Sequence, residues 1–382
     1  MTWDIIGQER AIAVLRKAVE DESRLSHAYL FAGPERVGKA TAARRFAQAL
    51  NCDRHPGNQD SGGQGFLVPP EDAAEPGKAR RREDGDTVSA PCGECRTCRL
   101  IAEDKHADVE FVGVGGICDE TEHRDHGADG SRDIRICQIR RLEKVVSRSP
   151  FEARYRVIII DPADALTQEA ANAFLKTLEE PPPSVVLVLV TAREAALRET
   201  VRSRCRRVGF SGVPRAEIEA ALQERWQAEP ELASRLARLA QGRLGWAVAA
   251  LEDERLLIDR DEVMDEIEAL LAGGDEERFG YAASLGARYS RDPATVRSSL
   301  AVWDAWWGDV LLVAAGQESL AAETERLDTL RLHAAQYKVA GAVTALNAVA
   351  DARRHLEEHA SPTLALEVML LELPRAGARA GS

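Results

Sequence analysis

The stretch GPERVGKATA, residues 33–42, has the residue types and spacing of a phosphate-binding loop. Gly33, Gly38 and Lys39 stand where such a loop has its two glycines and its lysine, but Ala40 follows where Ser or Thr is usual. The missing hydroxyl would be a ligand of the Mg²⁺ that bridges the β- and γ-phosphates, and a methyl group cannot coordinate a hard cation. We therefore expect impaired Mg²⁺ ligation at this loop.

Two interpretations of the loop stay open. In the first, Gly33, Gly38 and Lys39 keep the backbone cradle and the cation that let an anion dock at a helix N-terminus, which predicts weak ATP binding. In the second, the glycines are required only by the geometry of a strand-to-helix turn.

A second element of nucleotide chemistry is the apolar run VIIID, which ends at Asp161. In phosphate-loop hydrolases such a strand carries a metal-binding carboxylate at its carboxyl end. The next residue is Pro162, which has no proton acceptor where an acid would polarise the attacking water. Asp164 could substitute for that acid, but we expect it to cap a helix that begins near Leu166.

Four cysteines have the composition of a structural zinc site. Cys92, Cys95 and Cys98 stand in PCGECRTC, with two residues between neighbours, and Cys52 precedes them. Four thiolates complete a tetrahedral Zn²⁺ shell with no open position, as in structural sites. A redox or incidental cysteine cluster is the alternative, and a reducing cytoplasm disfavours it. We expect one structural Zn²⁺ here.

A shorter polar segment, 113–133, contains Cys118, His123 and His126. Their spacing matches no common zinc knuckle, so we interpret them as solvated loop residues, with a second metal site as the alternative. Cys137 is interpreted as a small buried residue.

Short apolar runs predict the strands that position these residues. The runs 28–31, 109–112, 157–160 and 185–190 are continuous, as in strands buried on both faces. Helical patterns lie between them, and alternating strands and helices predict an α/β fold with a parallel sheet. From about Pro214 onward only helical patterns follow.

The chain is expected to divide into three folded parts. An α/β domain with the zinc module spans 1–212, a helical lid spans 213–257, and a helical collar spans 258–376, before a disordered tail at 377–382. Within the first part, residues 53–91 are predicted to be a flexible insertion. Five prolines, six glycines and mixed charge leave too little apolar surface there to offset the entropy of ordering.

Two apolar stripes at helical spacing predict packed helices in the collar. The first stripe is Trp303, Trp306, Trp307 and Val310, and the second is Leu366, Met369, Leu370 and Leu373.

Composition excludes several classes of protein. The 382 residues are 45% apolar and 30% charged, and no run of about 18 apolar residues occurs, so a membrane span is not expected. The first ten residues lack the basic and apolar stretches of an export signal, which predicts a cytoplasmic protein. The net charge of −13 argues against nucleic-acid binding by bulk attraction but leaves room for a local basic face.

Four stretches together resemble the bacterial DNA polymerase III clamp loader, an AAA+ assembly. They are DIIGQERA, SHAYLFAGPERVGKATAARRFAQALNC, YRVIIIDPADALTQEAANAFLKTLEEPPP and VRSRC. The resemblance covers the α/β domain and, more loosely, the helical remainder. It is closer to the delta-prime type of subunit than to the gamma/tau motor, which keeps the loop hydroxyl and an acid after its strand aspartate. The long insertion at 53–91 departs from the common pattern.

The resemblance implies roles for three further positions. Arg204, in Ser203-Arg204-Cys205, would be an arginine finger that reaches the ATP of a neighbouring subunit, where a guanidinium neutralises developing charge; an ordinary surface arginine is the alternative. Thr191 would be a first sensor near the γ-phosphate, or else a buried strand-end threonine satisfied by backbone. Gly245 stands where a second-sensor arginine is expected. We therefore expect little or no ATP hydrolysis by this chain.

The resemblance also implies partners. These are gamma/tau and delta-type subunits in a five-subunit ring closed by the collar helices, the sliding clamp, and primer-template DNA, with no membrane partner. Candidate phosphate contacts are Arg140, Arg141, Lys144 and Arg148, although a solvated helix face is the alternative. Two other functions remain as alternatives, an active gamma/tau-like ATPase and a zinc-containing nucleic-acid adaptor outside replication.

Overall fold

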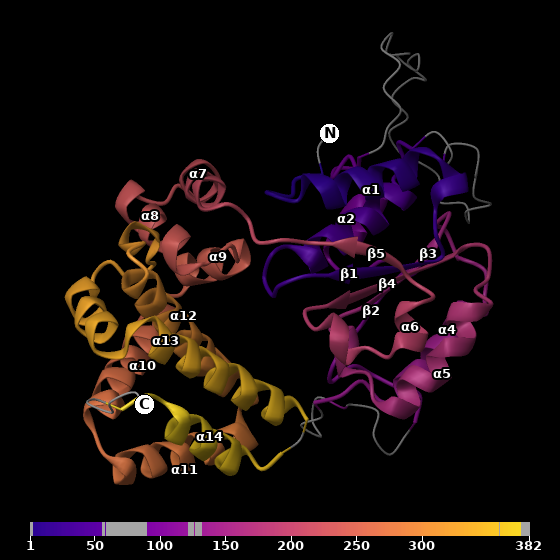
Figure 1. Cartoon of the computed structure of the whole chain (residues 1–382). Helices are drawn as coiled ribbons and strands as arrows, with labels where there is room; N and C mark the ends of the chain where they lie inside the picture. Colours follow the sequence, from indigo (N-terminus) through magenta and orange to yellow (C-terminus); the bar gives the residue numbers. More distant parts are fainter. Residues whose placement is uncertain are drawn as a thin grey trace. The chain divides into compact units, whose positions relative to one another are not determined.

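A parallel β-sheet forms the centre of the first part of the chain (Figure 1). Its five strands lie in the order β2-β3-β4-β1-β5, and each neighbouring pair is parallel. The computed structural model describes residues 3–55, 58, 90–120, 126, 132–358 and 360–375. The strands are β1 (Ala28–Ala32), β2 (Val109–Val112), β3 (Arg156–Ile160), β4 (Val185–Thr191) and β5 (Arg206–Gly209).

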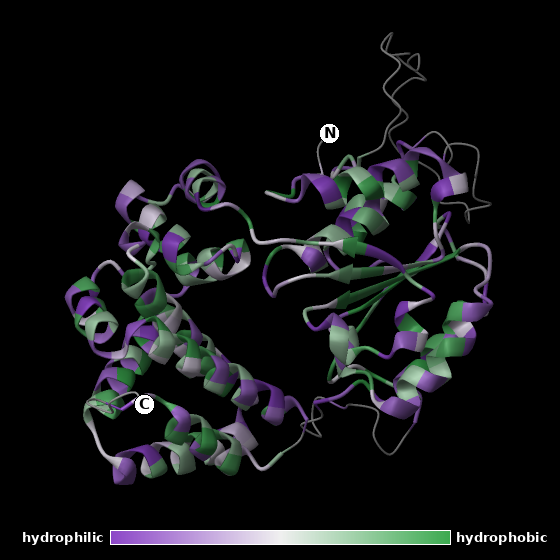
Figure 2. Ribbon diagram, viewed as in Figure 1, coloured by the Kyte–Doolittle hydropathy of each residue, from purple (hydrophilic) through white to green (hydrophobic). Residues whose placement is uncertain are grey.

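Helices cover both faces of the sheet, which explains why its central strands are continuous apolar runs. All residues of β1, β3 and β4 are buried, and Figure 2 shows these strands as apolar. Helices α1 (Glu9–Glu20) and α2 (Lys39–Asn51) cover one face, where Phe46 packs edge-on against Tyr29. Helices α4 (Ile136–Val146) and α5 (Gln168–Glu179) cover the other (Figure 1).

Short elements complete this part of the chain. They are α3 (Arg96–Ala102), α6 (Glu199–Arg202) and the 3-10 turns η1 (Glu22–Arg24), η3 (Ala163–Ala165) and η4 (Glu194–Ala196).

In the residues that the structure describes, the second part of the chain contains no strands, only helices. They are α7 (Arg215–Trp226), α8 (Pro230–Leu239), α9 (Leu244–Glu252), α10 (Arg255–Ala272), α11 (Asp275–Arg291), α12 (Pro293–Ala314), the turn η5 (Glu318–Leu320), α13 (Leu327–Glu357) and α14 (Pro362–Glu372). Helix α13 is interrupted at Lys338, whose φ of 56° is not helical. Both predicted apolar stripes are buried in one core, in which the three tryptophans of α12 have no exposed surface.

The predicted fold class is confirmed in its architecture: a parallel α/β sheet, a four-cysteine insertion and a helical C-terminal region. The chain divides into one unit of Met1–Glu217 with Gly242–Gly245 and another of Ile218–Gln241 with Trp246–Ser382. The finer division into lid and collar stays a prediction. Most of the predicted insertion at 53–91, and the tail at 377–382, lie outside the described residues.

Within the described residues, none of the helices has the length and apolar character needed to cross a membrane.

Candidate functional site

The phosphate loop connects β1 to α2, as its sequence predicts, and its turn requires both glycines. A Cβ atom on Gly33 would overlap the carbonyl oxygen of Phe210. Gly38 is the N-cap of α2 and has a φ of +98°, which L side chains rarely adopt. Ala40 is the second residue of the helix. The turn alone therefore accounts for the glycines, and nucleotide binding stays a prediction.

Lys39 is held by the loop itself. Its ammonium donates to the carbonyl oxygen of Gly33 at 2.7 Å and to that of Pro34. The residue is only 6% exposed, and this burial lowers the pKa of Lys39, although the carboxylate of Asp161 acts in the opposite direction. A phosphate that binds here must compete with two backbone carbonyls for the ammonium.

Asp161 follows the carboxyl end of β3, near Lys39. Burial raises the pKa of Asp161, and the positive charge of Lys39 partly offsets that rise. The peptide N–H of Asp161 donates to the carbonyl of Val112 in the neighbouring strand, at 3.0 Å. The next residue in the chain is Pro162, whose side chain cannot activate water.

Asp164 contacts the end of β4 and does not cap a helix, so its predicted capping role was wrong. The residue lies in η3, and its carboxylate accepts from the hydroxyl of Thr191 at 2.6 Å and from the guanidinium of Arg193, also at 2.6 Å. The N-cap of α5 is Thr167, which accepts from the peptide N–H of Ala170 at 3.2 Å. Asp164 is therefore engaged by a cation and a hydroxyl.

Thr191 has a side-chain partner, although the sequence suggested backbone satisfaction as the alternative to a sensor role. It is 1% exposed, and besides donating to Asp164 its hydroxyl accepts from the peptide N–H of Arg193 at 2.9 Å. Arg193 is a residue that sequence reasoning missed, because a lone arginine after a strand carries no distinctive pattern. Whether Thr191 senses phosphate stays a prediction.

Gly245 and Gln8 also form hydrogen bonds with backbone carbonyls in or beside the loop. The peptide N–H of Gly245 donates to the carbonyl oxygen of Arg36 at 2.8 Å, and a Cβ on Gly245 would lie 3.0 Å from that oxygen. The side chain of Gln8 donates to the carbonyls of Val37 at 3.3 Å and Ser211 at 2.7 Å. Position 245 thus packs against the loop as a glycine, and no guanidinium is available there. Gln8 had no role assigned from the sequence.

Arg204 follows the short helix α6 and is held by an acid at the end of α5. Its guanidinium lies 2.6 Å from the carboxylate of Glu179 and donates to the carbonyl of Thr200 at 2.8 Å. About a third of the side chain is exposed. A ligand with more negative charge than one carboxylate can therefore reach it.

The basic residues of α4 differ in their surroundings. Arg141 pairs with Glu110 and, at 3.7 Å, with Asp119, which also pairs with Lys144 at 3.1 Å. Arg140 and Arg148 are exposed. The acids reduce the positive charge that Arg141 and Lys144 offer to DNA, so Arg140 and Arg148 are the better placed of the four predicted contacts.

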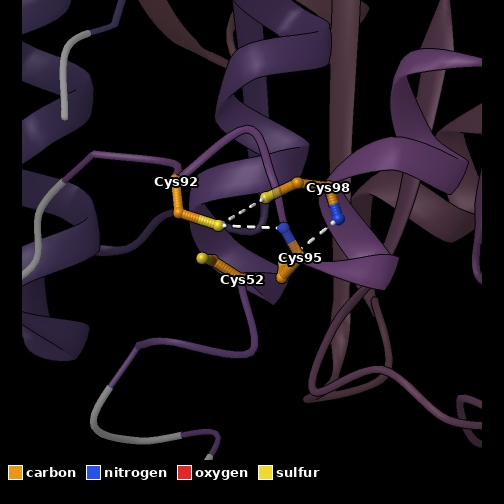
Figure 3. Close-up of side chains that lie close together, drawn as sticks. All are labelled: Cys52, Cys92, Cys95 and Cys98. Atoms are coloured by element: carbon orange, nitrogen blue, oxygen red, sulfur yellow. Dashed lines mark hydrogen bonds between the residues drawn. The ribbon is translucent and has the colours of Figure 1, made fainter.

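The four predicted zinc ligands converge at the far end of α2 (Figure 3). Cys52 is the C-cap of α2, and Cys95 is the N-cap of α3. The four sulfur atoms lie within 4.8 Å of one another, and Cys92 Sγ is 3.9 Å from Cys98 Sγ. Sulfur atoms around tetrahedral Zn²⁺ are about 3.8 Å apart, since each Zn–S bond is about 2.3 Å. The donor set and its spacing are consistent with a structural zinc site.

The hydrogen bonds of this cluster favour a thiolate at Cys52, whereas burial raises the pKa of Cys95 to about 11. The peptide N–H of Cys95 donates to Cys92 Sγ at 3.3 Å, and that of Cys98 donates to Cys95 Sγ at 3.4 Å. The pKa of Cys52 is lowered to about 5, chiefly because the thiol of Cys98 donates to it. The side chain of Gln48, on α2, donates to the carbonyl of Cys98 at 2.6 Å and joins the cluster to that helix.

Cys118 and His126 are buried, so their interpretation as solvated loop residues was wrong. Their exposed fractions are 2% and 0%, and both lie beside Cys137, which is buried as predicted. His123 lies outside the described residues. This group could not be predicted from spacing, because its members come from stretches of irregular spacing.

Comparison with known proteins gives a consistent family. A family model described as "DNA polymerase III, delta subunit" matches residues 7–64 and 79–214, just over half of the chain. The delta-prime subunit of DNA polymerase III from Bacillus subtilis is 25% identical over 96% of each chain. The tau subunit of the same organism is 29% identical over 72% of this chain and 41% of its own length.

Other similarities are partial or loose. The tau/gamma subunit of Haemophilus influenzae is 27% identical over 71% of this chain and 33% of its own length, so this chain spans less than half of these tau relatives. A solved structure of a DNA polymerase III gamma-subunit-related protein from Thermotoga maritima has a TM-score of 0.38 and 19% identity, over 94% of this chain and 97% of that one.

Proposed function

We propose that this chain serves as a stator subunit of a sliding-clamp loader. The chain belongs to the DNA polymerase III delta-prime subunit family, which supports this role. In this role it joins gamma/tau and delta-type subunits in a five-subunit ring that loads the clamp onto primer-template DNA. Similarity over nearly the whole length of the Bacillus subtilis delta-prime subunit supports the delta-prime type.

The observation that carries the stator role is a phosphate loop that keeps the turn geometry of a nucleotide site but lacks the groups needed for hydrolysis. Ala40 offers no oxygen to Mg²⁺, Pro162 offers no base, and the ammonium of Lys39 is bound by carbonyls of its own loop. Each loss alone reduces transfer of a phosphoryl group, and together they remove metal ligation and water activation. Any ATP bound here is held weakly and is not hydrolysed.

Arg204 is the residue that gives this stator an active part. It would act in trans as an arginine finger on the ATP of a neighbouring subunit. Its partial exposure and its position just after a short helix, beside Glu179, support that role, since the guanidinium needs only to exchange one carboxylate for a triphosphate. DNA would contact the α4 face through Arg140, with Arg141 and Lys144 contributing less.

An active gamma/tau-like ATPase is the second candidate. The 29% identity to the tau subunit of Bacillus subtilis favours it, but that similarity covers 72% of this chain, against 96% for the delta-prime subunit. The three positions 40, 162 and 245 argue against it.

Reconstitution tests the proposed function. Purified gamma/tau and delta-type subunits would be mixed with the sliding clamp and primed DNA, with or without this chain. We expect clamp loading only when this chain is present, and we expect the chain to elute with the other subunits in size-exclusion chromatography. Loading that is equally fast without it would contradict the proposal.

A further inference from the structure

A second group of metal-binding side chains lies outside both the phosphate loop and the four-cysteine cluster. One donor atom from each of Cys118, His126 and Cys137 lies within 4.8 Å of the other two. All three residues are buried, with Cys137 the most exposed at 6%. Two thiols and an imidazole thus converge inside the protein from three separate stretches of chain.

We propose that Cys118, His126 and Cys137 bind a second Zn²⁺. Thiolate and imidazole are the ligands that Zn²⁺ prefers in proteins, and Cys and His combine in many structural sites. In a tetrahedral site with Zn–S bonds of about 2.3 Å and Zn–N bonds of about 2.0 Å, adjacent sulfur and nitrogen atoms are about 3.5 Å apart. His126 Nε2 lies 3.1 Å from Cys137 Sγ, so only a small adjustment would admit the ion.

Hydrogen bonds at the start of α4 already hold two of the stretches together. Cys137 is the second residue of that helix. The side chain of Gln138 donates to the carbonyl of Gly113 at 3.0 Å and accepts from the peptide N–H of Arg135 at 2.8 Å. The segment that leads to Cys118 is therefore docked at the start of the helix that carries Cys137.

A metal at this site would organise the surface of α4. Asp119, directly after Cys118, pairs with Arg141 and Lys144 of that helix. Binding of Cys118 to the same ion as Cys137 would fix the position of Asp119 along α4. Three protein ligands leave one coordination position, which water or a further side chain fills.

Metal content provides the test, and its result does not depend on the clamp-loader assignment. Protein purified without chelator would be analysed for zinc, as wild type and as Cys118→Ser, His126→Ala, Cys137→Ser and Cys92→Ser. We expect about two Zn²⁺ per chain in the wild type and about one in each variant, because each substitution removes a ligand of one site only. The double variant Cys92→Ser/Cys118→Ser should hold almost none. Cys205→Ser, outside both groups, should keep about two.

Cobalt substitution checks the ligand set independently. In protein reconstituted with Co²⁺ alone, Cys118→Ser should lower the thiolate-to-metal absorption by about a third, since four of six thiolates remain at the other site. One Zn²⁺ in the wild type, unchanged in Cys118→Ser, would overturn the proposal. So would five free thiols in the denatured chain in place of all seven cysteines, because that result means a Cys118–Cys137 disulfide.

Discussion

The guanidinium of Arg204 lies 2.6 Å from the carboxylate of Glu179, so the proposed arginine finger is held by an acid of its own chain. Glu179 is the last residue of α5, and Arg204 follows α6. Ion pairs at exposed positions contribute between about 0 and 1 kcal/mol. Such a pair orients the arginine without preventing its transfer to a more strongly charged triphosphate.

Arg204→Ala should leave the subunit folded and assembled but impair its neighbour. We expect a change in unfolding free energy within about 0.5 kcal/mol, because the residue is on the surface. ATP turnover at the one site that the finger reaches should fall by up to about three orders of magnitude. Total turnover falls less, since other sites keep their own fingers, whereas clamp loading should fall further. Steady-state ATPase and loading assays on the assembled ring measure both effects.

Arg207→Ala is the matched control for the finger. Arg207 lies three residues after Arg204 in the chain. It is exposed and forms an ion pair with Glu194 at 2.8 Å. Its loss should leave ATPase and loading unchanged. A ring with Arg204→Ala that loads clamps at the wild-type rate would show that Arg204 is an ordinary surface arginine.

The isolated chain should turn over ATP no faster than Lys39→Ala. The wild type already lacks the metal ligand at position 40 and the base at position 162, so we expect it to have little ATPase activity. Loss of the lysine should therefore lower the rate very little. Ala40→Ser should not restore turnover, because it supplies only the first of these groups. Phosphate release from highly purified protein provides the measurement, and a rate per chain comparable to that of a tau subunit would refute this expectation.

Cys92→Ser should cost stability rather than nucleotide chemistry. Loss of one of four ligands weakens metal binding, and that binding free energy is folding free energy, so we expect a loss of several kcal/mol in the first unit. Thermal unfolding with and without added Zn²⁺ measures the effect. Cys205→Ser is the control, since burial raises the pKa of Cys205 to about 12 and keeps it a neutral thiol away from the cluster. Equal stability of the two variants would argue against a structural ion.

The sequence predicts the strands that are buried on both faces, because such strands must be apolar. It does not predict an exposed strand, whose residues can be polar. Runs such as β3 and β4 must be apolar because helices cover both sides. In β5, at the edge of the sheet, only Val208 is buried, and Arg206 and Arg207 are exposed. An edge strand of four residues with two arginines has no apolar run, so the sequence pattern missed it.

The sites divide in a similar way, between local and long-range signals. Regular spacing within PCGECRTC identified the four-cysteine cluster. Cys137 joins Cys118 only because the segment after β2 docks on α4, and no spacing rule encodes that contact. Asp164 was assigned to a cap because its local sequence suits one, whereas pairing with Thr191 depends on the neighbouring strand.

Asp108, just before β2, should stabilise the amino ends of β2 and β3 through a buried ion pair. Its buried carboxylate pairs with Arg156 at 2.7 Å and accepts from the peptide N–H groups of Phe151, Glu152 and Ala153. Asp108→Ala would leave a buried guanidinium and three donors without this acceptor. We expect a loss of about 3–5 kcal/mol in unfolding free energy, measured by urea denaturation.

The stabilisation by Asp108 should depend on pH. Burial raises the pKa of Asp108, but the hydrogen bonds from Glu152, Phe151 and Arg156 outweigh it and hold the pKa below its usual value. Because the folded pKa is the lower one, the stabilisation is complete above the unfolded value of about 4 and is lost as the pH falls through the folded pKa. The stability difference between wild type and Asp108→Asn should therefore be constant near neutral pH and shrink below about pH 4.

Glu103→Ala, which removes an exposed pair with Lys105, is the control and should change stability by no more than about 0.5 kcal/mol. A difference between wild type and Asp108→Asn that is independent of pH down to acid unfolding would show that Asp108 acts through its shape and not through its charge.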